Sequence, residues 1–208
     1  MYDIKTTACF TGHREEKLNI AADTVKMLLS KEIEKAISSD GFNTYLSGMA
    51  SGVDVWAAEI VLEMKERNPD IRLVCVLPFE GFDKQRSSEE KEQYDSIMER
   101  ADKVEVICSH YSRSCFQLRN KWMVDNSSLV IAVYNGEKGG TRNTIKYAKR
   151  YEKEICNLLS ENSGAELLGA YDLVNYVIKP YVSDNISSEK STSEIIWSMS
   201  FMLHRLCI

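Results

Sequence analysis

The fold of this protein is decided by the stretch Thr44-Tyr-Leu-Ser-Gly-Met-Ala-Ser-Gly-Val-Asp-Val-Trp-Ala-Ala-Glu59. Its first three residues predict a short buried strand, and the apolar pattern from position 53 to position 66 predicts a helix. Gly48 and Gly52 lie in the turn between them, where glycine allows a sharp change of direction. A strand that passes through such a turn into a helix begins a β-α-β unit, so the stretch predicts a parallel sheet.

Similar units recur on both sides of this stretch. Short runs rich in Val, Ile and Cys alternate with longer stretches of helical periodicity. Ser87 and Glu90 fit a capping box at one helix start. Strands are predicted over residues 6–10, 44–46, 71–77, 103–108, 129–134 and 154–158, and helices over residues 18–36, 53–66, 88–101, 113–125 and 141–151. This order predicts one three-layer α/β domain over residues 1–162, with a mostly parallel six-stranded sheet.

The pattern weakens after this domain. A helix is predicted over residues 167–178, Pro180 breaks it, and residues 183–193 form a Ser-rich linker. Residues 195–206 bring several apolar side chains together on a short helix. We therefore expect a helical C-terminal extension over residues 163–208, whose last helix could dock or form a homo-oligomer contact.

Composition excludes several protein classes. The 208 residues include 26 Lys and Arg and 31 Asp and Glu, a net charge of −5. This charge argues against binding along a whole nucleic-acid backbone but leaves room for a local basic pocket. No apolar run is long enough to span a membrane, and the N-terminus lacks a signal-peptide pattern. The sequence therefore predicts a cytoplasmic protein without a membrane partner.

The six cysteines form no C-x-x-C pair, and several lie in apolar runs that predict buried strands. Cys108, His110 and Cys115 are close in sequence, but a zinc site built from them would lack a fourth ligand. We therefore expect buried thiols and no metal centre.

Glycine-bearing turns follow the first, second and fifth predicted strands. The carboxyl ends of parallel strands meet at one sheet edge, where helix N-termini present free N–H groups to anions. One such turn is weak evidence, because any strand-to-helix turn favours glycine, but three at one edge favour an anionic ligand. Thr141 could also cap the helix predicted over residues 141–151 and offer its hydroxyl to the same anion. The candidate ligand-binding residues here are Thr11, Gly12, His13, Arg14, Ser47, Gly48, Gly52, Asp54, Gly136, Gly139, Gly140 and Thr141.

Two further loops are predicted at the same edge. Pro78 and Phe79 open the loop after the third strand, where Phe79 or Phe82 could cover a bound base. Tyr111 and Arg119 follow the fourth strand and are similarly placed. These loops add Pro78, Phe79 and Arg119 to the candidate ligand-binding residues.

Other features allow two interpretations. Trp56 fits either a core position or stacking on a base. Two predicted helices carry basic residues, and these fit either solvated helix faces or, with one arginine on a phosphate, a nucleic-acid groove. The basic residues are Arg113, Arg119 and Lys121 on one helix and Arg142, Lys146, Lys149 and Arg150 on the other.

Neither G-x-G-x-x-G after the first strand nor G-x-x-x-x-G-K-[ST] is present, so a standard NAD site and a Walker-type NTPase are not supported.

The combination of three motifs resembles one superfamily. Thr11-Gly-His-Arg14, Leu46-Ser-Gly-Met-Ala-Ser-Gly-Val-Asp-Val-Trp-Ala-Ala-Glu59 and Ser128-Leu-Val-Ile-Ala-Val-Tyr-Asn-Gly-Glu-Lys-Gly-Gly-Thr141 occur in the order found in the SLOG superfamily, and the sequence is most similar to its YpsA-like family. The resemblance covers residues 5–159. It implies a Rossmann-like fold that binds nucleotides or nucleotide-derived ligands, in a superfamily that includes the LOG phosphoribohydrolases and the DNA-processing protein A family.

The resemblance also implies roles for particular residues. It places the phosphate-facing backbone at Gly12, Gly48, Gly52, Gly139, Gly140 and Thr141. Asp54 and Glu59, on the helix after Gly52, are the candidate catalytic residues. LOG hydrolases carry a glutamate three positions after the threonine of their glycine-rich loop, whereas this chain has Thr144 there. A threonine cannot supply the carboxylate charge that cleavage of an N-glycosidic bond requires.

These observations predict a cytosolic protein that binds a nucleotide or a nucleotide derivative, with a sensor or regulatory role and weak or no hydrolase activity. One alternative is a single-stranded nucleic-acid binder that resembles the DNA-processing proteins. Another is a LOG-like nucleoside monophosphate phosphoribohydrolase. No cofactor is required, although Asp54 and a ligand phosphate could share Mg²⁺.

Overall fold

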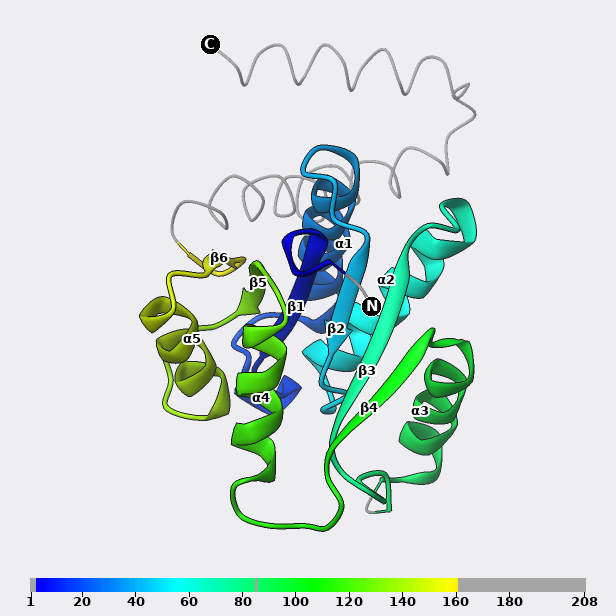
Figure 1. The fold of residues 1–208 in the computed structure, drawn as a ribbon, viewed down its shortest axis with the longest axis vertical. Helices are drawn as coiled ribbons and strands as arrows, with labels where there is room; N and C mark the ends of the chain where they lie inside the picture. The colour runs from blue at the N-terminus through cyan, green and yellow to red at the C-terminus, as the bar shows by residue number, and fades with distance from the viewer. Residues whose placement is uncertain (1–2, 85, 161–208) are drawn as a thin grey trace, which may run out of the picture. The chain divides into compact units, whose positions relative to one another are not determined.

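The computed structural model describes residues 3–84 and 86–160. They form an α/β sandwich around one six-stranded sheet of order β4-β3-β2-β1-β5-β6, in which every neighbouring pair is parallel (Figure 1). The predicted α/β fold with a six-stranded parallel sheet is confirmed. The predicted helices and linker beyond residue 160 lie outside the described residues.

The elements follow the predicted order with small shifts at their ends. The strands are β1 (Thr7–Gly12), β2 (Thr44–Ser47), β3 (Arg72–Phe79), β4 (Lys103–Cys108), β5 (Leu129–Val133) and β6 (Glu154–Asn157). The helices are α1 (Ala22–Ser38), α2 (Val53–Arg67), α3 (Ser88–Arg100), α4 (Cys115–Asp125) and α5 (Gly140–Arg150). Short 3-10 turns cover Ile4–Thr6 and Glu15–Lys17, and the capping box of Ser87 and Glu90 is present at the start of α3.

The end of β3 differs from the prediction, which ended this strand at residue 77. Pro78 lies within the strand and is buried. Proline has no N–H to donate, but none is needed here, because β2 ends opposite Cys75 and the pairing with β4 passes from Leu77 to Phe79. The longer strand carries Phe79 to the sheet edge.

The helices cover both faces of the sheet. In Figure 1, α4 and α5 lie in front of the sheet and pack on each other, while α1 and α2 lie behind it. The front layer buries one apolar cluster against the strands, made of Cys9, Leu46, Val74, Val76, Met123, Val124, Val130 and Ala148. None of the helices in the described ranges is long and apolar enough to cross a bilayer.

The strand order positions the site. Connections from β1 run one way to β4, and the chain then returns to β5 on the other side of β1. Parallel α/β sheets bind ligands beyond the carboxyl ends of their strands near such a reversal. Because every pair is parallel, the six strands end on the same side of the sheet, and in Figure 1 the strands β1 to β4 run toward the lower side of the picture.

Candidate functional site

The loops after β1, β2, β3 and β4 surround a cavity of about 1050 Å³, which we call the edge cavity. Arg14 and Phe79, two of the predicted ligand-binding residues, line it, together with Ser51 from the predicted glycine turn. Lys84 and Arg86 add positive charge to its wall, and Glu80 and Glu90 add negative charge. The cavity wall therefore carries both positive and negative side chains, and it also includes aromatic residues.

Aromatic rings form one side of the edge cavity. Phe79 is at their centre: its ring centroid lies 5.8 Å from that of Phe82, 5.3 Å from that of Tyr111 and 6.0 Å from that of Phe116, each in an edge-on arrangement. Tyr111 is 65% exposed and Phe116 is 39% exposed. Two aromatic rings thus remain available to a ligand.

Arg86 ties the β2–α2 turn to the β3–α3 loop. Its guanidinium donates to the backbone carbonyl of Met49 and lies 4.5 Å from the ring centroid of Tyr94. Ser51 Oγ donates to Glu90 Oε1 over 2.9 Å. Met49 has a positive φ of 56°, unusual for a side chain of this size. These contacts hold the strained turn in place beside the cavity.

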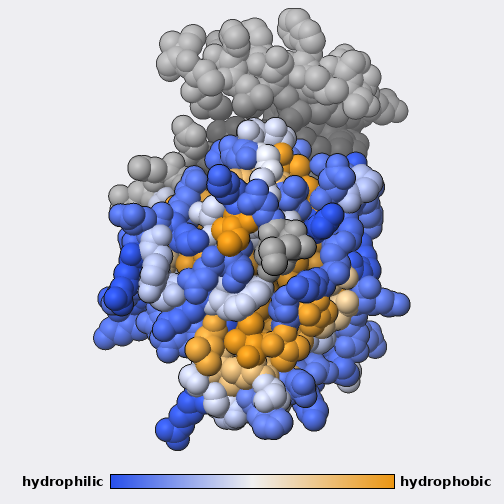
Figure 2. All heavy atoms as spheres, in the orientation of Figure 1, coloured by the Kyte–Doolittle hydropathy of each residue, from blue (hydrophilic) through white to orange (hydrophobic). Residues whose placement is uncertain are grey.

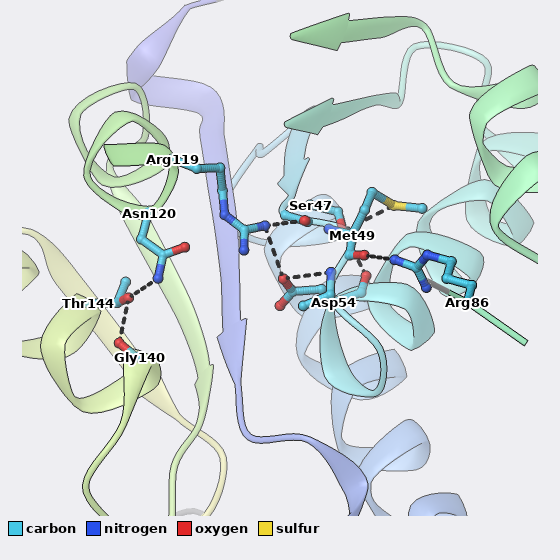
Figure 3. Close-up of polar contacts among 10 residues, drawn as sticks. Ser47, Met49, Asp54, Arg86, Arg119, Asn120, Gly140 and Thr144 are labelled. Atoms are coloured by element: carbon cyan, nitrogen blue, oxygen red, sulfur yellow. Dashed lines mark hydrogen bonds and ion pairs between the residues drawn. The ribbon is translucent and has the colours of Figure 1, made fainter. Parts of the chain in front are cut away.

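A buried ion pair lies on the other side of the same turn (Figure 3). Arg119 Nη1 of α4 lies 3.6 Å from Asp54 Oδ2 of α2 and also donates to the carbonyl of Gly48. Ser47 Oγ donates to the carbonyl of Asp54 over 2.8 Å, and the Ala50 N–H donates to Asp54 Oδ2 over 3.4 Å. Ser47, Asp54 and Arg119 thus hold the two ends of the β2–α2 turn together through hydrogen bonds to its backbone.

Glycine is required at two points of this turn. A Cβ at Gly48 would collide with the guanidinium of Arg119, so no other residue allows the arginine to approach. Gly52 has a φ of +89°, which other L-residues rarely adopt, and it forms the N-cap of α2. Both glycines thus serve the ion pair and the strand-to-helix turn, whatever ligand is present.

Both charges of this pair are buried. Burial raises the pKa of Asp54 above its ordinary value, an effect opposed by the nearby Arg119 and by the Ala50 N–H. Burial likewise lowers the pKa of Arg119, and Asp54 opposes that shift. Because a guanidinium stays protonated in proteins, Asp54 acts as its counter-ion. Arg119 is buried, so the interpretation of the basic residues of α4 as a solvated helix face is wrong for this residue.

The structure brings the turn after β1 to the turn after β5. The ring centroids of His13 and Tyr134 lie 5.5 Å apart, and the backbone N–H of His13 donates to the carbonyl of Val133 over 3.3 Å. His13 is 4% exposed, and its Nε2 is buried without a hydrogen-bond partner in the described structure. His13 thus lies apart from the edge cavity, whereas its neighbour Arg14 lines it.

The remaining predicted ligand-binding residues do not line the edge cavity. Thr11, Pro78 and Thr141 are buried, and Gly136 and Gly139 have open space where a Cβ would lie. Thr141 does not cap α5, because the N-cap is Gly139 and no side chain bonds there. Gly140 lines a separate hollow between α4 and α5.

Thr144, which stands where LOG hydrolases carry a glutamate, is bonded within the protein. Thr144 is 5% exposed, accepts a hydrogen bond of 3.0 Å from Asn120 Nδ2 and donates to the carbonyl of Gly140 over 3.0 Å. Figure 3 shows this link between α4 and α5 beside Arg119. The threonine therefore joins two helices and supplies no carboxylate.

Trp56 and Glu59 of α2 contact neighbouring helices. Glu59 accepts a hydrogen bond of 2.7 Å from Gln93 Nε2 of α3. Trp56 is 7% exposed, with Lys26 of α1 over its ring at 5.6 Å from the centroid. The core interpretation of Trp56 is confirmed, and Glu59 lies at a helix contact.

Cys108, His110 and Cys115 lie around the β4–α4 loop. Cys115 Sγ accepts from the Ser112 N–H over 2.9 Å and donates to the carbonyl of His110 over 3.3 Å. Within the described ranges, no three His, Cys, Asp or Glu side chains are grouped as metal ligands would be. The cysteine therefore has local hydrogen-bond partners.

Sequence reasoning missed Lys84, Arg86 and Phe116 as cavity residues. Phe116 is one of several apolar residues on a helix, and nothing in its spacing distinguishes it. Arg86 follows a loop whose path depends on contacts with residues far away in the chain. Only the position of the loop after a predicted strand pointed to this region.

Known proteins resemble most of the part of the chain that the structure describes. The family model described as the YspA SLOG family matches residues 8–160. The chain belongs to the YpsA SLOG family. A UPF0398 protein of Bacillus thuringiensis is 29% identical over 155 residues, which cover 71% of this chain and 84% of that protein. The SPbeta prophage-derived protein YoqJ of Bacillus subtilis is 32% identical over 130 residues, or 57% of this chain and 76% of YoqJ.

A solved structure has the same fold as this SLOG domain. DNA processing protein A from Helicobacter pylori, which binds single-stranded DNA, aligns with a TM-score of 0.53 over 88% of this chain and 81% of that chain. The two sequences are 16% identical, so the likeness concerns the fold. The predicted family membership and the predicted Rossmann-like architecture are both confirmed.

Proposed function

We propose that this SLOG protein is a cytoplasmic protein that binds a nucleotide or a nucleotide derivative in the edge cavity. The observation that carries the proposal is the juxtaposition, in one cavity, of the exposed rings of Tyr111 and Phe116 with the cations Arg14 and Lys84. A base stacks on aromatic rings, and a phosphate pairs with cations. A ligand that carries both groups satisfies both walls of the cavity.

The geometry supports a sensor or regulatory role better than hydrolysis. Asp54, the first candidate for a catalytic carboxylate, is buried against Arg119 and does not line the cavity. Thr144 occupies the position of the LOG glutamate and bonds to Asn120 and Gly140. Glycosidic cleavage needs a carboxylate beside the sugar, so binding without turnover is the expected behaviour.

Mg²⁺ is not required in this proposal. Asp54 already neutralises Arg119 and is no free ligand for a metal. Glu80 and Glu90 line the cavity, and Glu90 accepts hydrogen bonds from Ser51 and from the Ser87 N–H. Binding measured with and without EDTA tests this point, and equal affinities are expected.

A single-stranded nucleic acid is the second candidate ligand. The same fold binds single-stranded DNA in the Helicobacter pylori protein. The specific observation that favours it here is a basic groove next to the edge cavity, described below. Salt separates the two candidates, because a strand that contacts Z phosphates loses affinity with a slope of about −0.7Z on a log-log plot.

The test is a thermal-shift screen of the full chain against nucleotides, nucleoside monophosphates and nucleotide derivatives, with mass spectrometry of whatever co-purifies. A ligand at 100 times its Kd should stabilise the fold by about 2.7 kcal/mol. Calorimetric titration then compares Tyr111→Ala with Tyr151→Ala, a control because Tyr151 is also exposed but lies outside the cavity. Weaker binding by Tyr111→Ala alone supports the site. No hit in the screen, or equal binding by the two variants, refutes it.

A further inference from the structure

A second hollow of about 580 Å³ lies between α4 and α5, and we call it the α4–α5 groove. Four of its lining residues are cations: Arg113 and Lys121 from the α4 side, and Lys146 and Arg150 from α5. No acidic side chain lines it. In a chain with a net charge of −5, such a local excess of positive charge indicates an anionic ligand.

The positive charge of the groove is not neutralised from nearby. Within residues 3–84 and 86–160, none of these four cations forms an ion pair. Asp125 accepts a hydrogen bond of 3.0 Å from the Tyr147 hydroxyl and does not line the groove. The cations are therefore available to a ligand.

Aromatic rings lie among these cations. Tyr147 lines the groove, with Lys121 Nζ 5.4 Å from its ring centroid, and Phe116 lines the groove at its other end. Cations that follow a backbone, with aromatic rings for bases, are the pattern of single-strand binding sites. Duplex bases are stacked inside the helix and cannot use such rings.

The groove adjoins the edge cavity. Phe116 lines both the groove and the edge cavity, so the two hollows share a wall. From Asn143 to Arg150 the groove follows α5 for about 10 Å at 1.5 Å per residue, an elongated shape that exceeds one phosphate.

Figure 2 shows this face of the molecule. An apolar area lies in its lower half, over α4 and the neighbouring strand ends, and hydrophilic residues cover the side that carries α5. Phe116 and Leu118 are exposed apolar side chains of α4. A ligand that crosses from α5 toward the edge cavity therefore passes from charged to apolar surface.

We propose that the α4–α5 groove binds the phosphodiester backbone of a single-stranded nucleic acid whose terminal nucleotide occupies the edge cavity. This inference rests on the proposed function, because the cavity holds the terminal base. Arg113, Lys121, Lys146 and Arg150 contact successive phosphates, and Phe116 contacts the base at the junction. The ligand is thereby an oligonucleotide strand, for which a mononucleotide is the smallest fragment.

The experiment uses fluorescent oligothymidylates of increasing length, from the mononucleotide upward, and the full-length protein at several salt concentrations. The test variant is Lys146→Gln/Arg150→Gln. Its control is Arg142→Gln/Lys149→Gln, which removes the same charge from the same helix at positions that do not line the groove. Melting curves verify that both variants are folded.

The proposal predicts that affinity rises with strand length, and that the test variant binds the longer strands at least about tenfold more weakly. The salt slope of the test variant should be smaller by about 1.4, since two phosphate contacts are lost, while the control keeps the wild-type slope. Equal loss in both double variants would show a general charge effect and overturn the proposal. So would an affinity that is independent of strand length.

The two proposals fail in different ways. If mononucleotides bind and lose affinity in Tyr111→Ala, while strand length and the groove variants have no effect, the edge cavity stands and the groove proposal falls. If strands bind through the groove but Tyr111→Ala changes nothing, the proposed function of the cavity falls, and with it the placement of the terminal nucleotide.

Discussion

The carboxylate of Asp54 and the guanidinium of Arg119 lie 3.6 Å apart, buried, on helices that cover opposite faces of the sheet. Arg119 reaches the β2–α2 turn at the carboxyl edge and bonds to the carbonyl of Gly48 there. This relationship joins the two helical layers at the edge where the ligand is proposed to bind. It also removes both side chains from the set available to a ligand.

Removing one partner of this pair should destabilise the protein strongly. Arg119→Met leaves the Asp54 carboxylate buried without its counter-ion, and the expected loss is about 3–5 kcal/mol of unfolding free energy. The double variant Asp54→Asn/Arg119→Met should recover part of that loss. Urea unfolding measures both. If the double variant is no more stable than Arg119→Met, the two charges are not coupled.

Gly48→Ala should destabilise the fold because its Cβ would displace the Arg119 guanidinium. The expected cost is about 1–3 kcal/mol, as for other overpacked sites. Gly139→Ala is the control, since nothing lies within 4 Å of the added Cβ and its backbone is extended. Thermal melting of the two variants checks this, and equal stability of Gly48→Ala and wild type would contradict the contact.

His13 should make the protein less stable in mild acid. Burial lowers the pKa of His13 below its ordinary value of 6.5, an effect that Glu137 opposes. The unfolded state then binds the proton more readily, so stability is lost as the pH falls below about 6.5. His13→Gln should remove this part of the pH dependence, while the exposed His110→Gln should keep it. Urea unfolding at about pH 7.5 and at about pH 5.5 measures how much unfolding free energy each variant loses on acidification. An equal loss in the two variants would contradict the role of His13.

Arg14→Ala should weaken nucleotide binding without destabilising the protein. The side chain is exposed at the edge cavity, and a charge-assisted hydrogen bond to phosphate contributes about 1.5–3 kcal/mol, roughly ten- to hundredfold in Kd. Arg67→Ala, exposed at the end of α2, is the matched control. Calorimetric titration with the nucleotide identified in the screen measures the change. Wild-type affinity in Arg14→Ala would show that this turn does not contact the ligand.

Release of a free base from nucleoside monophosphates should be absent or far slower than in LOG enzymes. Thr144 stands at the position of their glutamate and is bonded to Asn120 and Gly140. Chromatography of the free base after incubation with the protein measures it. Efficient release that Asp54→Asn abolishes, with binding retained, would show that the carboxylate has moved to Asp54.

The order of the elements could be predicted from the sequence because its causes are local. Alternation of apolar strands with periodic helices requires a parallel sheet, and glycine turns after β1, β2 and β5 place three loops at one edge. The capping box of Ser87 and Glu90 needs residues only three positions apart. Even the exception, Pro78 within β3, depends on where a neighbouring strand ends.

The site depended on contacts between residues far apart in the chain. Asp54 and Arg119 resemble a helix-start charge and a surface arginine in the sequence, and they pair only because α2 and α4 begin at the same sheet edge. Lys121 and Lys146 share a groove only because α4 packs on α5. Periodicity shows which face of a helix is apolar but not which other helix packs beside its polar face. The packing of the helices therefore determined which of the predicted turn residues are structural and which line the edge cavity, and it also formed the α4–α5 groove.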